Sequence, residues 1–162
     1  MHLQAGELTL LLRAASVDDD DFILALATRF VDFELPRWRR RHVVLEGIRR
    51  DLSRHLEEQP PGSFMFVAED DTSGERIGFL HLQLLVDFFT GHQNCHVSDL
   101  AVSAPHDGQG IGQALLGYAE RFAREHRCER LQLSVFPGNT RARSLYERNG
   151  FGTEMLRLVK PL

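Results

Sequence analysis

Residues 104–116 read APHDGQGIGQALL, and this stretch decides the fold. Glycines at positions 108, 110 and 112 run directly into an apolar helical pattern. The first N–H groups of a helix have no backbone partner and carry a partial positive charge. Glycines there leave no Cβ to hinder an anion, and they allow a positive φ. A strand, a glycine-rich turn and a helix in this order therefore predict a cradle for a phosphate group.

The spacing of these glycines excludes two common nucleotide cradles. A dinucleotide motif G-x-G-x-x-G that began at Gly108 would need Gly or Ala where Gln113 stands. One that began at Gly110 would need the same where Leu115 stands. The P-loop needs Gly-Lys-Ser/Thr, which the chain lacks. The ligand of this loop is thus expected to be a different phosphate compound.

Length and composition indicate one ordinary domain over residues 1–162. Hydrophobic residues make up 43% and charged residues 26%, and the net charge of -4 argues against a nucleic-acid partner. Cys95 and Cys128 fit neither a disulfide framework nor a metal motif. No basic segment precedes the first apolar run, and no run reaches the roughly 20 residues of a membrane span. We therefore expect a cytoplasmic protein without a membrane partner.

Hydrophobic periodicity predicts an α+β fold, a mixed and mostly antiparallel sheet of about six to seven strands with about four flanking helices. Ser16, three residues before Asp19, is typical of a helix cap. Pro36 ends or interrupts the helix that follows this cap. The predicted strands cover 8–15, 63–70, 75–89, 94–104, 129–136 and a closing segment from 151, and the predicted helices cover about 22–31, 42–58, 109–126 and a short stretch after 138.

A second group of polar residues lies in GNTRARSLYERNGF, residues 138–151. Asn139 stands at a helix start and Tyr146 seven residues later, so both lie on one face with the small Ala142 between them. Taken alone, Asn139 fits a helix cap and Tyr146 fits a core residue. Gly150 is placed to end the helix.

The two blocks together, SDLAVSAPHDGQGIGQALL and LSVFPGNTRARSLYERNGF, resemble the GNAT superfamily of acyl-CoA-dependent N-acyltransferases. The resemblance covers about residues 94–155, while the first 90 residues share only the order of elements. It implies acetyl-CoA as the co-substrate, no metal, and direct attack of a primary amine on the thioester in a ternary complex. A non-catalytic acyl-CoA sensor is the alternative.

The resemblance also implies roles for individual residues. The loop from Asp107 to Gly112 would bind the pyrophosphate, the strand before it and Asn139 would bind the pantetheine arm, and Tyr146 would protonate the departing thiolate. The implied cofactor contacts are Leu100, Ala101, Val102, Asp107, Gly108, Gln109, Gly110, Ile111, Gly112, Gln113, Asn139, Ala142, Arg143 and Tyr146.

Asp107 departs from the family pattern, which usually has Arg or Gln at this position. Since a diphosphate would repel the carboxylate, we expect Asp107 to turn outward or to cap the helix near Gln109 and Gly110. The helix start, helped by Arg141 or Arg143, would then supply the positive charge. On this basis an arginine at position 107 would tighten CoA binding or leave it unchanged.

An acceptor amine must lose a proton before it attacks, so the site needs a base. Strict alternation along the strand places His96 and Ser98 on one face with Leu100, and Asp99 on the other. Histidine has a suitable pKa, so His96 is the predicted base, ahead of Asp99 and of His81 on the neighbouring strand.

The acceptor stays open at this stage. The expected acceptor wall combines carboxylates with the basic cluster PRWRRRH at 36–42, and these favour opposite substrate charges. A covalent route through Cys95 and a metal site at His92 and His96 are less favoured. A homodimer through the exposed last strand is a further expectation. The acceptor-side candidates are Asp32, Glu34, Trp38, Asp87 and the arginines of that cluster.

Overall fold

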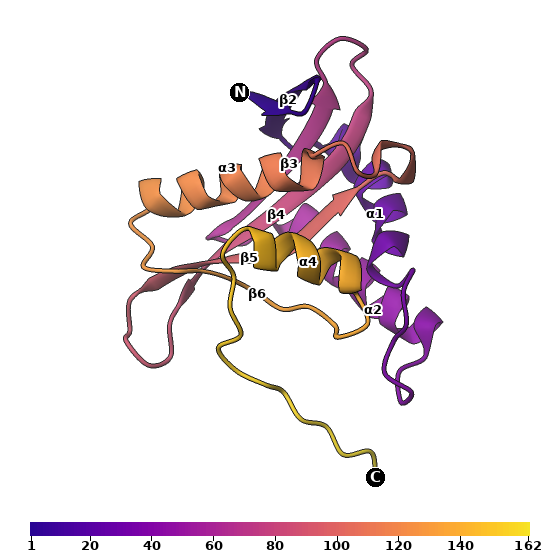
Figure 1. Cartoon of the computed structure of the whole chain (residues 1–162), viewed down its shortest axis with the longest axis vertical. Coiled ribbons are helices and arrows are strands. Elements are labelled where there is room, and N and C mark those ends of the chain that lie inside the picture. The colour runs from indigo at the N-terminus through magenta and orange to yellow at the C-terminus, as the bar shows by residue number, and fades with distance from the viewer.

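A six-stranded sheet with strand order β1-β2-β3-β4-β5-β6 forms the centre of the computed structural model, which describes residues 1–162 (Figure 1). Every neighbouring pair is antiparallel except β5 and β6, which are parallel. The mixed sheet predicted from the sequence is therefore confirmed. The strands are β1 (His2–Ala5), β2 (Leu8–Ala14), β3 (Ser63–Asp70), β4 (Arg76–Val86), β5 (Gln93–Val102) and β6 (Leu131–Leu133).

Helices cover both faces of this sheet (Figure 1). On one face α1 and α2 bury Ile23 and Leu52 against Phe79, and on the other α3 buries Leu115 against the sheet with α4 beside it. None of the helices is both long and apolar enough to cross a lipid bilayer. The helices are α1 (Asp20–Leu26), α2 (Arg41–Glu58), α3 (Ile111–Glu125) and α4 (Thr140–Arg148), with 3₁₀ turns at Val17–Asp19, Ala27–Phe30 and Ala104–His106.

The predicted closing strand is wrong. The chain after α4 forms no strand, its residues from 152 onward are exposed, and Figure 1 shows it running away from the sheet. A strand is stabilised by its ladder of hydrogen bonds, and β6 is only three residues long, so little paired edge is available. The sixth strand is instead β1, whose four residues are too short to show an alternating pattern.

The predicted cap at Ser16 is confirmed, and it is part of a buried ion cluster. The Ser16 N–H donates to Asp19 Oδ2 at 2.8 Å. The fully buried Asp19 carboxylate also accepts from Arg13 at 2.7 and 2.9 Å and pairs with Arg76 at 2.7 Å. The hydrogen bonds from Arg13 hold the pKa of Asp19 well below its usual range. This cluster ties the start of α1 to β2 and β4.

Asp19→Asn is expected to destabilise the fold by about 1–3 kcal/mol, because the charged hydrogen bonds of Asp19 are lost, although Arg13 keeps its ion pair with Glu69. Urea unfolding followed by circular dichroism measures this loss. The matched control is Asp18→Asn at an exposed position of the same turn, which should change stability by less than about 0.5 kcal/mol. Equal effects of the two variants would contradict the structural role of the cluster.

Candidate active site

A β-bulge at Ser98 decides which face of β5 carries each polar side chain. His81 pairs with Asp99 and Leu82 with Val97, so the register shifts by one residue at this point. Asp99 therefore lies on the face of His81, toward α2, and Leu100 faces the core beneath α3. The bulge resets the alternation, so two predictions are wrong: that Asp99 and His96 lie on opposite faces, and that His96 and Leu100 share one. Asp99 and Leu100 do lie on opposite faces, as predicted. The only sign of this bulge in the sequence is the pair of adjacent polar residues, Ser98 and Asp99, in an otherwise mostly apolar strand.

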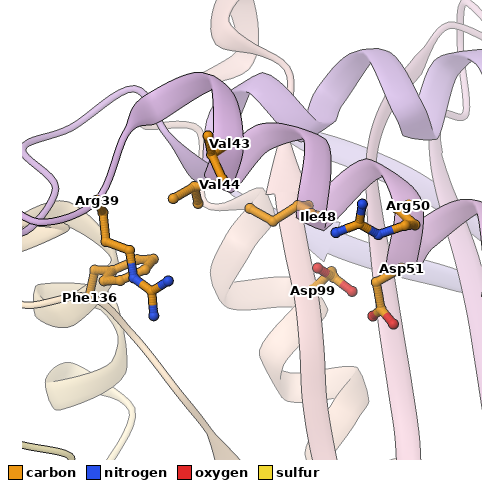
Figure 2. A pocket seen from close by; sticks show the side chains of 9 residues that line it. Arg39, Val43, Val44, Ile48, Arg50, Asp51, Asp99 and Phe136 are labelled. Atoms are coloured by element: carbon orange, nitrogen blue, oxygen red, sulfur yellow. The ribbon is translucent and has the colours of Figure 1, made fainter. Parts of the chain in front are cut away.

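A pocket of about 420 Å³ opens between α2 and the C-terminal half of β5, where Asp99 lies. Figure 2 shows Asp99 and Asp51 at one end, with Arg50 above them, and Arg39 near Phe136 at the other. The middle of the wall is apolar. The pocket is therefore suited to a short organic molecule that carries at least one charge. The full lining is Arg39, Val43, Val44, Gly47, Ile48, Arg50, Asp51, Asp99 and Phe136.

Only Arg39 among the predicted acceptor-side residues lines this pocket. Asp32 pairs with Arg29 at 2.8 Å. Asp87 lies in the turn between β4 and β5, where it accepts from the backbone N–H of Thr90 at 2.8 Å, so it is a turn residue. Sequence reasoning missed Arg50 and Asp51 because a polar helix face gives no sign of what it covers.

The glycine-rich loop presents a run of backbone donors. The N–H groups from Gly108 to Gln113 donate no hydrogen bond within the protein, and the first three of these residues are exposed. Gly108 and Gly110 have φ values of +79° and +82°, which only glycine adopts without strain. The expected positive φ is confirmed. Six successive free N–H groups at the start of α3 form a site with the chemistry that an anion requires.

If the loop holds the CoA that the resemblance implies, Gly108→Ala should weaken CoA binding by about tenfold. It should also lower the free energy of unfolding by about 1–2 kcal/mol, because alanine is strained at this φ although space is available for its Cβ. Gly117→Ala is the control, since Gly117 lies within α3 with nothing near its missing Cβ. That change should stabilise the protein by about 0.5–1 kcal/mol. Calorimetric titration with CoA and thermal melting of both variants measure these effects. Undiminished CoA affinity in Gly108→Ala would count against the loop as the cradle.

Asp107 faces two arginines beside this loop. It accepts from Arg29 at 2.7 and 2.9 Å and from Arg141 of α4. Hydrogen bonds from Arg141 and Arg29 lower the pKa of the Asp107 carboxyl. The alternative that Asp107 caps α3 is wrong, because the N-terminus of α3 carries no side-chain cap. An arginine at position 107 would repel both guanidiniums, so the structure reverses the expectation of unchanged or tighter binding.

The sheet opens between β5 and β6. The two strands pair only over Cys95–Val97 and Leu131–Leu133. Beyond Val97, β5 has no neighbouring strand on this side, and Leu100, Ala101 and Val102 lie in this open part. The backbone of β5 beyond Val97 is therefore unpaired on the side of β6.

Helix α4 is fixed at both ends, which places Tyr146. At its start, the Asn139 side chain accepts from the Ala142 N–H at 3.2 Å, so the capping interpretation is confirmed. At its end, the Phe151 N–H donates to the Tyr146 carbonyl and Gly150 has φ +83°, as in a Schellman motif. Burial, and next the negative charge of Asp99, raise the pKa of Tyr146. Tyr146 packs against the core cluster on the α3 side of the sheet. Arg143 donates to the Pro137 carbonyl at 3.2 Å.

The other predicted reactive groups differ in access. His96 is partly buried, its Nδ1 has no hydrogen-bond partner, and burial lowers its pKa. His81 is fully buried. Burial raises the pKa of the Cys95 thiol to about 12, which removes the thiolate that a covalent route would need. His92 pairs with Glu129. His96 Nδ1 is thus a buried ring nitrogen without a partner, in a residue that is itself partly exposed.

The protein is expected to lose stability between pH 7.5 and pH 5. The pKa values of His55 and His96 are lowered by burial, so the unfolded chain binds more protons as the pH falls through about 6.5. The urea midpoint of the wild type should fall as the pH decreases over this range, and the midpoint of His96→Gln should fall less. A pH-independent midpoint, or an equal fall in both proteins, would contradict the depressed pKa values.

Comparison with known proteins settles the family. The family model described as "Acetyltransferase (GNAT) family" matches residues 26–151, which includes the loop, the opening of the sheet and α4. The chain belongs to this family. It is therefore related to acyltransferases, and the matched residues include the glycine-rich loop.

Individual relatives are distant. The chain is 28% identical over 153 residues to an aminoalkylphosphonate N-acetyltransferase from Salmonella typhimurium, covering 93% of this chain and 90% of that protein. It is 33% identical over 95 residues to a streptothricin acetyltransferase from Streptomyces lavendulae, covering 59% of this chain and 47% of that protein. A solved structure, described as a putative acetyl transferase from Pyrococcus furiosus, superposes with a TM-score of 0.72 at 23% identity, over 94% of this chain and 99% of that one. This likeness shows the shared fold.

Proposed function

We propose that this protein transfers an acetyl group from acetyl-CoA to a primary amine by direct attack in a ternary complex. The observation that carries the proposal is the run of six unpartnered N–H groups from Gly108 to Gln113, directly beside the opening between β5 and β6. A diphosphate fits the first feature and an extended arm with free amide groups fits the second.

The positive charge for the diphosphate comes from three sources. The N–H groups and the dipole of α3 provide the first two. The third is the pair Arg29 and Arg141, which Asp107 holds together beside the loop. Asp107 thus serves binding through the arginines that it orders, and this explains how a carboxylate is tolerated at a position where the family usually has Arg or Gln.

The chemistry needs a base and an acid on opposite sides of the thioester. Acetyl-CoA supplies the thioester. A base on β5, His96 or Asp99, takes a proton from the ammonium group so that the nitrogen lone pair can attack the carbonyl carbon. As the C–S bond breaks, Tyr146 gives its proton to the sulfur and is restored by the second proton of the nitrogen. The raised pKa of Tyr146 keeps this hydroxyl protonated until that step.

The acceptor enters through the pocket between α2 and β5. Its carboxylates suit a cationic amine, and Arg39 and Arg50, which form no ion pair, suit an anionic group elsewhere on the molecule. The related protein from Salmonella typhimurium is named for aminoalkylphosphonates, which carry both groups. We therefore rank such amines first. A cytoplasmic location stays a prediction from the sequence. A homodimer also stays one, but the last strand that was expected to form its interface is absent.

Thiol release from acetyl-CoA tests the proposal with a panel of amines: 2-aminoethylphosphonate, streptothricin, lysine, spermidine and a peptide with an N-terminal alanine. The expected result is release with at least one amine and a product heavier by one acetyl group. CoA binding without turnover for every amine would favour the acyl-CoA sensor. An absence of CoA binding would reject both.

A further inference from the structure

Four polar side chains form one hydrogen-bond chain that ends at the pocket; the two histidines are buried, and Ser63 and Asp99 are partly buried. Asp99 Oδ2 lies 2.8 Å from His81 Nδ1, and His81 Nε2 lies 2.9 Å from Ser63 Oγ. Ser63 Oγ lies 2.8 Å from His55 Nδ1. His55 and His81 are 6% and 0% exposed, and their rings meet edge to face at 4.5 Å. This hydrogen-bond chain runs from α2 through β3 and β4 to β5. Of its four side chains, only Asp99 lines the pocket (Figure 2).

Arg54, which lies next to the His55 end of this hydrogen-bond chain, fixes the direction of every hydrogen bond in it. The Arg54 guanidinium lies 3.1 Å from His55 Nε2 and can only donate, so this nitrogen accepts. His55 Nδ1–H then donates to Ser63, and the Ser63 hydroxyl donates to His81 Nε2. His81 Nδ1–H is left to donate to Asp99. Both neutral histidines therefore carry their proton on Nδ1, and all donors point toward Asp99.

We propose that His55, Ser63 and His81 are positioning residues that aim Asp99 into the pocket, where Asp99 accepts the proton of the acceptor ammonium. This inference rests on the proposed acetyl transfer. A hydrogen bond to a carboxylate favours its charged form, and His81 occupies only one of the two oxygens. The other oxygen takes the proton from nitrogen and later releases it to water.

The hydrogen-bonded order Ser63–His81–Asp99 matches that of a hydrolase triad, but here the carboxylate, and not the serine, lies at the pocket. A nucleophilic serine must face the substrate, and Ser63 does not line the pocket. The carboxylate faces the pocket instead. Burying two histidine rings in contact carries a desolvation cost that apolar residues would avoid, and the proposed positioning of Asp99 accounts for their presence.

The charged neighbours of the chain do not disturb this arrangement. On the α2 side they are the donor Arg54 and the carboxylate of Asp51, 3.9 Å from His55 Nε2. Burial, followed by the neighbouring His81, lowers the pKa of His55, which keeps that ring neutral. The titratable groups that face Asp99 are His81, His96 and Tyr146, with Arg50 and Asp51 on the pocket wall.

Nitrogen-15 NMR of the imidazole rings tests the chain without any acceptor. His55 and His81 should both be in the Nδ1–H form at pH 7.5. In Ser63→Ala, Arg54 and Asp99 still hold both tautomers, but His81 Nε2 loses its donor, so the nitrogen-15 signal of this unprotonated nitrogen should move downfield. Nε2–H forms in the wild type, or an unmoved His81 Nε2 signal in Ser63→Ala, would overturn the assigned direction.

The pH profile of kcat/KM tests the consequence for Asp99, with acetyl-CoA and the panel amine that gives the fastest thiol release. His81→Leu removes the donor, so the acid limb should move up by about one pH unit, a tenfold loss on that limb. His81→Asn keeps a donor near Nδ1 and should restore most of the profile. The KM for acetyl-CoA should not change in either variant.

Two outcomes separate the inference from the proposed function. If no amine reacts with the wild type, acetyl transfer fails, and carbon-13 titration of the Asp99 carboxyl then replaces the rate profile, with a raised pKa expected in His81→Leu. If the wild type reacts but His81→Leu leaves the acid limb in place, the positioning role fails while the function stands. Retained CoA binding and thermal unfolding show that each variant is folded.

Discussion

Asp99→Asn is expected to lower kcat/KM for the amine by about 10²–10⁴-fold, the usual contribution of a general base. Asparagine has almost the same shape and can still accept the hydrogen bond from His81, so the pocket should be preserved. The side chain can no longer take a proton, and the acid limb of the pH profile should disappear. The KM for acetyl-CoA should be unchanged, because Asp99 lines the acceptor pocket.

Asp51→Asn is the matched control for this prediction. It removes the same charge from the wall of the same pocket, but Asp51 is paired with Arg54 at 2.8 Å and does not end the buried chain. If attraction of a cationic amine is all that matters, the two variants should lose similar activity. If His96 is the base, Asp99→Asn would be nearly silent and His96→Ala would lower the rate mostly at low pH.

Tyr146→Phe is expected to lower kcat by about 10²-fold or more while CoA binding stays within about twofold. Phenylalanine keeps the ring that packs 5.7 Å from Phe151 and therefore keeps the end of α4 in place. Only the proton for the departing thiolate is lost. Steady-state rates and calorimetric titration with CoA separate the two effects.

A matched variant of the same helix is Leu145→Ala, which removes packing and no proton donor. Leu145 lies against Gly112, so this change should weaken CoA binding and stability more than it changes kcat. Wild-type turnover of Tyr146→Phe would show that the thiolate leaves without a proton from this hydroxyl. A loss of CoA affinity equal to the loss of kcat would assign Tyr146 to binding.

The local signals in the sequence predicted most of the fold. The glycine loop, the cap at Ser16 and the Gly150 stop at the end of α4 all act within a few residues, and all are present. The prediction of a closing strand was wrong because a strand forms only beside a partner strand, and the residues of the segment itself do not show whether one is available. The same reason explains why the short β1 was missed, since its pairing with β2 creates it.

The candidate site was harder to predict than the loop, because it depends on one inserted residue. A bulge at Ser98 moves Asp99 to the α2 face, and a one-residue slip of this kind reverses every assignment that follows it. The partners of Asp107 lie 78 and 34 residues away in the sequence, so neither Arg29 nor its meeting with Arg141 leaves a local trace. The site therefore depends on contacts between side chains that are far apart in the sequence, which a local sequence pattern does not reveal.

Mass spectrometry of the amine panel after incubation with acetyl-CoA tests the proposed function most directly. Wild-type protein is predicted to give an amine heavier by one acetyl group, with one free thiol released for each product molecule. Gly108→Ala should need more acetyl-CoA for the same rate, and Asp99→Asn should give little product at any concentration. Acetylation of no amine by protein that binds CoA normally would contradict the proposed transfer and leave the sensor as the function.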